Sequence, residues 1–240
     1  VTMSLLSEEG RAAFIAQHQA DYASIRSSHG AAKTALVDLA TARARRTPVD
    51  WRADDVAQPA RTGVHVLKDF PHATLREYID WTPFFHTWEL KGVYPRILDD
   101  AKYGEQARQL LADANAMLDR IIDGHLLHAH GVYGLFPANA VGDDVEVYED
   151  EGRGTVRTHF RFLRQQAERS ADQPYRSLSD FVAPKGTALP DHIGAFAVTT
   201  GIGLRELCDG FRAAHDDYSA IMAEAVADRL AEAFAECLHK

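Results

Sequence analysis

A carboxylate, Asp80, stands directly before a run of large apolar residues in the stretch EYIDWTPFF, residues 77 to 85. Each aromatic side chain of such a run can bury about 150 to 250 Å², so we expect it to pack in the interior. Thr82 and Pro83 supply the N-cap and first residue of a helix, so Asp80 is not needed as a cap. Because an unpaired carboxylate beside a packed cluster costs several kcal/mol, Asp80 should reach solvent, pair with a base such as Arg96, or meet a cationic ligand.

A second group of carboxylates recurs every fourth residue near the end of the chain: Glu224, Asp228, Glu232 and Glu236. Residues spaced by four lie on one face of a helix, where like charges repel mildly. Arg229 offers partial relief. The pattern is typical of a solvated helix face.

Histidines are the other side chains that could do chemistry, and His125, His128 and His130 stand close together in HLLHAH. Their spacing does not match HExxH, and no cysteine or carboxylate follows at a ligand-like interval. A loop after a helix explains these histidines, and we expect no metal site. His215 stands beside acidic residues but has no visible nucleophile to activate, so a structural role is expected.

Gly201 and Gly203 in TTGIG form half of a phosphate-binding loop and lack the third glycine or the lysine, so they predict a turn into the last helix. Cys208 and Cys237 have no activating partner in the sequence and should be buried. We therefore expect no covalent catalytic residue in this chain.

Composition narrows the possible partners. The 240 residues carry 26 basic and 35 acidic side chains, a net charge of -9, which disfavours nucleic acid as a partner. Two cysteines are too few for a disulfide framework and indicate a reducing compartment. No apolar run reaches the roughly 18 residues of a membrane span, so a cytoplasmic protein without a membrane partner is expected. The chain opens on Val1 and closes within a helical pattern, as a piece of a longer protein would.

The elements that position these residues follow from the apolar spacing. Residues 7 to 46 are rich in alanine with a thin apolar stripe, which predicts one long or two short helices. Residues 47 to 63 contain Pro48 and Pro59 and read as an extended linker.

The rest of the chain mixes strands and helices without a regular alternation. A strand is predicted near residues 64 to 66, a helix over 103 to 127, a hairpin over 131 to 150 with its turn at 142 to 144, a strand over 155 to 163, a buried strand over 192 to 201, and a helix over 204 to 239 that is broken near His215. This order indicates an α+β fold of mixed helices around an antiparallel-rich sheet.

Several long blocks resemble the C-terminal activation domain of cobalamin-dependent methionine synthase, in order from about Val64 onward. They are EYIDWTPFFHTWEL, YPRIL, GLFPANAVGDDVEVY, LRQQ, LSDFVAP, DHIGAFAVT and HDDYSAIMAEAVADRLAEAFAE. The resemblance implies that residues 1–62 are a helical connector and linker from a preceding cobalamin-binding domain. Residues 63–240 would then be the activation domain, truncated at its C-terminal end.

The function that this resemblance implies is repair of the cobalamin cofactor. The activation domain brings S-adenosylmethionine to oxidised cob(II)alamin, which a neighbouring domain presents, while flavodoxin or an equivalent reductase supplies an electron. Asp80 and Glu232 match the family's S-adenosylmethionine contacts. Zinc would be confined to a homocysteine-binding domain absent from this chain.

One departure from the family pattern concerns its main ligand loop, Arg-Pro-Ala-Pro-Gly-Tyr-Pro, which should follow the last helix and does not appear before Lys240. Without it, tight ligand binding is not expected. An alternative is therefore a stand-alone docking or reactivation module, non-catalytic itself, for a corrinoid protein and its reductase.

Overall fold

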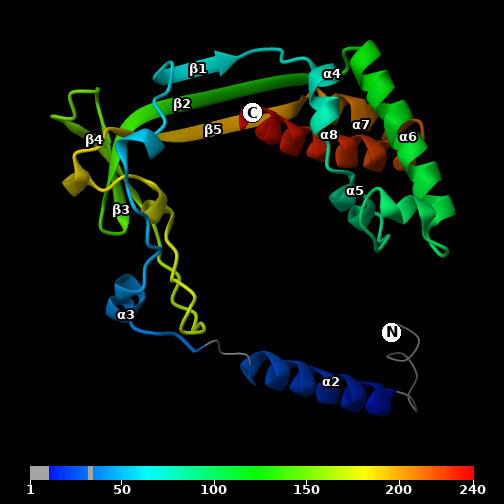
Figure 1. Ribbon diagram of the computed structural model, residues 1–240. Coiled ribbons are helices and arrows are strands. Elements are labelled where there is room, and N and C mark those ends of the chain that lie inside the picture. The colour runs from blue at the N-terminus through cyan, green and yellow to red at the C-terminus, as the bar shows by residue number, and fades with distance from the viewer. Residues whose placement is uncertain (1–10, 32–34) are drawn as a thin grey trace. The chain divides into compact units, whose positions relative to one another are not determined.

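The computed structural model describes residues 11–31 and 35–240, with the chain path drawn in Figure 1. The chain forms two compact units. The first joins the chain up to Ala57 with Ala138–Asp191, and the second joins Gln58–Pro137 with His192–Lys240. Each unit is therefore assembled from separate stretches of sequence.

The first unit opens with two helices, α2 (Arg11–Ala31) and α3 (Leu39–Ala44), as the alanine-rich sequence predicted. Residues 7–10 and 32–34 of that prediction lie outside the described part of the chain. Asp38 caps α3 by accepting a hydrogen bond from the Thr41 amide at 2.9 Å. Residues 47–62, all of them described, hold one short 3₁₀ turn, Ala53–Asp55, and no other helix or strand.

The strands are β1 (Gly63–Leu67), β2 (His128–Val141), β3 (Asp144–Tyr148), β4 (Val156–Arg161) and β5 (Asp191–Ile202). They hydrogen-bond in the order β1-β2-β3-β4, and β5 pairs with β2. The β1–β2, β2–β3 and β3–β4 pairs are antiparallel. Together with the helices this confirms the predicted α+β class.

A tight turn joins β2 to β3 at the predicted hairpin. Val141 pairs with Asp144, so only Gly142 and Asp143 lie between the strands. Gly142 has a φ of 66°, a left-handed conformation that glycine adopts without a steric penalty. The glycine therefore sets the register of the hairpin.

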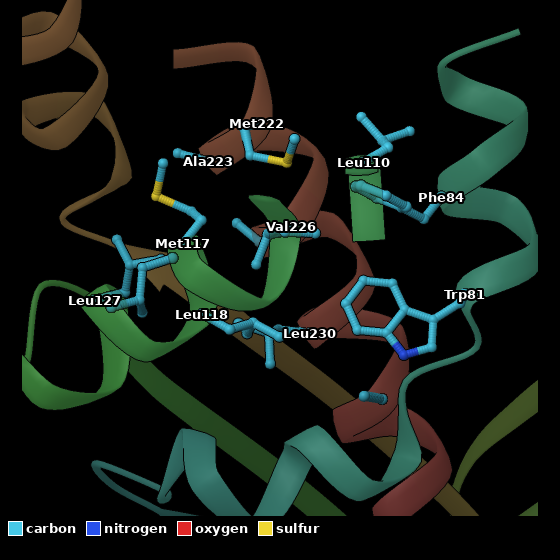
Figure 2. Close-up of a cluster of buried hydrophobic side chains, with 14 of the residues drawn as sticks. Trp81, Phe84, Leu110, Met117, Leu118, Leu127, Met222, Ala223, Val226 and Leu230 are labelled. Carbon is cyan, nitrogen blue, oxygen red and sulfur yellow. The ribbon is translucent and has the colours of Figure 1, made fainter. Parts of the chain in front are cut away.

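The core of the second unit lies among its helices, α4 (His72–Leu75), α5 (Trp81–Thr87), α6 (Gly104–Asp123), α7 (Leu204–Ala213) and α8 (Asp217–Leu238). Helix α6 confirms the predicted amphipathic helix. The closing helix is indeed broken, because His215 adopts a φ of 58° between α7 and α8. Figure 2 shows side chains of α5, α6 and α8, among them Phe84, Leu118 and Leu230, meeting in one cluster in which these three are fully buried.

Two expectations about β2 and β5 are wrong. The strand β5 was expected to be buried, yet Gly194, Ala195, Phe196 and Ala197 are exposed, and Thr200 is the buried residue in its sequence. Glycine and alanine gain little from burial, so an apolar run built largely from them does not require an interior position. His128 and His130 lie on β2 and not in a loop.

Candidate functional site

Asp80 is the N-cap of α5, contrary to the expectation that Thr82 would take this role. Its carboxylate accepts a hydrogen bond from the Thr82 amide at 2.9 Å. The helix begins at Trp81, and the Thr82 hydroxyl instead accepts a hydrogen bond from the Tyr94 amide at 3.2 Å. The Asp80 side chain is exposed and needs no pairing with Arg96.

The aromatic run after Asp80 packs as expected. Phe84 and Phe85 are fully buried, and Trp81 is 9% exposed. Trp81 meets the edge of Phe84 at a centroid distance of 5.3 Å. This packing fixes the start of α5, and with it the backbone amide that holds the Asp80 carboxylate in place.

Glu232 lies on the exposed face of α8, where the acidic series was predicted to be solvated. Its side chain is 55% exposed and forms an ion pair with Arg229. Arg229 also binds Asp228 at 2.6 Å, and Arg212 binds Glu224 at 2.6 Å from the preceding helix. The sequence had suggested Arg229 as the basic partner of this acidic series. The structure adds a second one, Arg212.

Asp80 and Glu232 line the same cleft, although 151 positions separate them in the sequence. Its volume is about 420 Å³, and it lies within the second unit. The lining comes from the segment that leads into α5 and from the last turns of α8: Glu77, Tyr78, Ile79, Asp80, Glu232, Glu236 and Lys240. The structure thus brings the two predicted site residues together.

The electrostatic character of this cleft is strongly acidic. Four carboxylates line it against one ammonium, that of Lys240, whose Nζ lies over the Tyr78 ring at 5.5 Å from the centroid. Carboxylates accept charge-assisted hydrogen bonds from ammonium groups and also bind paired hydroxyls. The cleft is chemically suited to a cationic ligand that carries hydroxyl groups.

Volume alone does not single out this cleft. A hollow of about 590 Å³ in the first unit is lined by residues that include Trp51 and Asp180, and it contains neither predicted site residue. The smaller cleft differs because most of the charged side chains that line it are negative. Their combined electrostatic potential attracts a cation.

The remaining candidates take structural positions. Asp69 contacts His128 at 3.0 Å and His130 at 3.4 Å, and the described residues contain no cluster of three or more His, Cys, Asp or Glu side chains arranged to hold a metal ion. Gly203 caps α7 with a φ of 97°, which confirms the predicted turn. Cys208 is buried as expected, whereas Cys237 is only half-buried.

None of the helices in the described ranges combines the length and the apolar character needed to cross a membrane.

Several lining residues were not predicted as site residues, namely Glu77, Tyr78, Ile79, Glu236 and Lys240. A usable signal was present for Glu236, because it follows Glu232 by four residues and shares its face of α8, whereas Lys240 lies just beyond the end of that helix. Glu77, Tyr78 and Ile79 stand directly before Asp80, but nothing in their local pattern shows that they face α8.

Known proteins are similar to this chain in sequence and fold. Residues 71–240 match the family described as the activation domain of vitamin B12-dependent methionine synthase. A solved structure, described as the crystal structure of the MetH reactivation domain bound to AdoHcy, is 50% identical and superposes with a TM-score of 0.77. The match covers 86% of this chain and 63% of that protein, so this chain spans less than two thirds of its relative. The chain belongs to the family of activation domains of vitamin B12-dependent methionine synthase.

Proposed function

We propose that the acidic cleft binds S-adenosylmethionine, with Asp80 and Glu232 as ligand contacts, for the reductive remethylation of oxidised cobalamin. The observation that carries the proposal is that these two carboxylates, distant in sequence, line one cleft. A relative that is 50% identical is described as bound to AdoHcy, which is what S-adenosylmethionine becomes after losing its methyl group.

The chemistry assigned to the larger enzyme is a methyl transfer to cobalt. Cobalamin held in a neighbouring domain, reduced by one electron from a reductase such as flavodoxin, would supply the nucleophile that takes up the methyl group. This chain would position the sulfonium of S-adenosylmethionine so that the methyl–sulfur bond breaks with its electron pair left on sulfur, which leaves AdoHcy.

The part of this chain in that reaction is to hold and orient the methyl donor. Asp80 and Glu232 accept hydrogen bonds from the ligand's ammonium and ribose hydroxyls, which fixes the donor for approach by a cobalamin held in a neighbouring domain. No covalent catalytic residue or metal ligand of this chain is required, and zinc would belong to a homocysteine-binding domain elsewhere. Residues 1–62 act as the connector and 63–240 as the activation domain.

The experiment that tests this proposal is calorimetric titration with S-adenosylmethionine and with AdoHcy. It should use the chain continued through an Arg-Pro-Ala-Pro-Gly-Tyr-Pro block where the gene encodes one. Asp80→Asn and Glu232→Gln remove one charge each and should weaken binding by about tenfold or more, as expected for charged hydrogen bonds. Asp80→Asn keeps the helix cap, because asparagine caps as well as aspartate does.

Asp228→Asn provides the matched control. Asp228 lies on the same helix as Glu232 and pairs with the same Arg229, but it does not line the cleft. Its substitution should leave affinity within about twofold, as an exposed ion pair contributes little. If the Asp80 and Glu232 variants bind as tightly as this control, the site assignment is wrong. A chain that binds a corrinoid protein and reductase but neither adenosyl ligand would support the docking-module alternative.

A further inference from the structure

Tyr78 is the aromatic residue in the lining of the acidic cleft. It belongs to the 3₁₀ turn Arg76–Tyr78, is half-buried, and packs against the hydrophobic core of the second unit. Cys237 of α8 packs against the same core. The ring is therefore held in a fixed orientation at the wall of the cleft.

A cation already lies over this ring. The Lys240 ammonium stands 5.5 Å from the ring centroid, within the range of a cation–π interaction. The pKa of Tyr78 is raised above its ordinary value, first by the electrostatic effect of the Cys237 side chain and then by burial. The side chain is thus a neutral phenol near pH 7, and the attraction comes from the π face of the ring.

The two adenosyl molecules of the proposed reaction differ in one charge. S-adenosylmethionine has a sulfonium, whereas AdoHcy has a neutral thioether, and the two share the ammonium, carboxylate and ribose. A sulfonium has no N–H or O–H to donate to a carboxylate. The face of an aromatic ring attracts such a cation without needing a hydrogen bond.

We infer that Tyr78 determines which of the two ligands is preferred: its ring face receives the sulfonium of S-adenosylmethionine in the place where the Lys240 ammonium lies. This inference rests on the proposed function of the same cleft. When the methyl group leaves, the sulfur loses its charge and the ring loses its cation. Tyr78 therefore favours the methyl donor and promotes release of the product.

The test is the ratio of the two dissociation constants, AdoHcy over S-adenosylmethionine, measured by calorimetry. Tyr78→Leu should lower this ratio about fivefold, the size expected of one cation–π contact at a solvent-exposed site. Tyr78→Phe keeps the ring and removes only the hydroxyl, so it should retain the wild-type ratio within about twofold. A purely structural role for Tyr78 would weaken both ligands together and leave the ratio unchanged.

Lys240 supplies a second, independent arm because it is exposed and its substitution does not disturb the core. Lys240→Gln should tighten the binding of S-adenosylmethionine several-fold more than the binding of AdoHcy. If the sulfonium and the Lys240 ammonium occupy the same position over the Tyr78 ring, this gain should be smaller in the Tyr78→Leu background. Lys91→Gln, at an exposed lysine outside the cleft lining, controls for the change in net charge.

The outcomes separate the two proposals. Failure of the wild-type protein, extended as in the titration above, to bind either ligand overturns the proposed function itself. Binding of both ligands with an unchanged ratio in folded Tyr78→Leu overturns the role of Tyr78 alone. Thermal denaturation checks folding, and Tyr78→Met, whose flexible side chain fills irregular space, replaces the leucine variant if that one unfolds. An additive effect of Lys240→Gln in the two backgrounds would also contradict the inference.

Discussion

Asp80 combines two roles that reinforce each other at the scale of a single residue. As the N-cap of α5 its carboxylate is held by the Thr82 amide, while the same side chain lines the acidic cleft. A cap fixes the direction of a side chain that would otherwise rotate freely in solvent, so a capping carboxylate is already oriented when a ligand arrives. The aromatic run behind it anchors the helix that provides the amide.

Substitution of Asp80 can separate the cap from the charge. Asp80→Ala should lower the free energy of unfolding by about 1 kcal/mol, the usual cost of a lost cap, whereas Asp80→Asn should cost much less. Chemical denaturation followed by circular dichroism measures both. Equal losses in the two variants would mean that the charge, and not the cap, stabilises α5.

At the scale of elements, a tyrosine connects the two long helices of the core. The Tyr218 hydroxyl of α8 donates a hydrogen bond to Asp113 Oδ2 of α6 at 2.7 Å, and the ring lies 5.4 Å from Trp88. Burial first, and the bond to Asp113 second, raise the pKa of Tyr218 from 10.0 to about 12. The neutral phenol is thus the form that joins the helices.

This shift predicts a titration behaviour at high pH. Because the folded-state pKa is raised, the stabilisation is complete below pH 10 and is lost as the pH rises through about 12. Ultraviolet titration should show one tyrosine ionising after the others, and Tyr218→Phe should remove this last step. Asp113→Asn should move it to lower pH, and a late step that survives in Tyr218→Phe would assign it to another residue.

Replacing Gly203, which precedes α7, and Gly210, which lies within α7, by alanine should change the free energy of unfolding in opposite directions. Gly203 has a φ of 97°, and a Cβ there would stand 2.8 Å from the Leu126 carbonyl oxygen. Gly210 is exposed within the helix, and a Cβ there would meet nothing within 4 Å. Gly203→Ala should cost about 1 to 3 kcal/mol, whereas Gly210→Ala should stabilise by up to about 1 kcal/mol. Thermal unfolding of the pair decides this, and a shift of the same sign in both would contradict the reading.

Local patterns predicted the elements that local spacing encodes. The i, i+3, i+4 apolar positions located α6, and Gly142 located the hairpin turn. The exposure of β5 was not predictable in this way, because it depends on what covers the strand and not on its own sequence. The cap at Asp80 was missed because Thr82 is an equally plausible N-cap residue by its local sequence. In the fold the Thr82 hydroxyl accepts a hydrogen bond from the Tyr94 amide instead.

The candidate site, like the fold, could be predicted only where the signal is local in the sequence. Spacing alone left Asp80 and the acidic stripe as ordinary surface features, and only family resemblance joined Asp80 to Glu232. The remaining lining of the cleft depends on the docking of α8 against the segment before α5, a contact between residues far apart in sequence. No periodicity within either segment encodes it.

At the scale of the whole molecule, each unit has its own source of stability, and that of the first unit includes a buried charge network. The Arg164 side chain is 1% exposed and binds Asp180 at 2.7 Å, Asp143 at 2.8 Å and the Tyr175 carbonyl at 2.6 Å. These residues come from the hairpin turn and from two later segments of the same unit. A single guanidinium therefore joins segments that share little regular structure.

Removing this guanidinium would leave two carboxylates with little solvent access, so Arg164→Leu should destabilise the first unit by about 3 to 5 kcal/mol.

Burial by itself would raise the pKa of Asp180, but hydrogen bonds from Arg164 and the Ser177 amide outweigh it and hold that pKa below 3.8. A lowered pKa means that the stabilisation is present above pH 3.8 and is lost as the pH falls through the folded value. In Arg164→Leu the buried carboxyl should protonate readily, so acid should destabilise the variant less than the wild type. Hydrogen exchange of Ala138–Asp191 amides between pH 3 and 7 measures this difference. Arg52→Gln, which breaks the exposed pair with Asp50, is the control and should cost under about 1 kcal/mol. A parallel acid response in wild type and Arg164→Leu would show that the network does not govern the acid stability of the first unit.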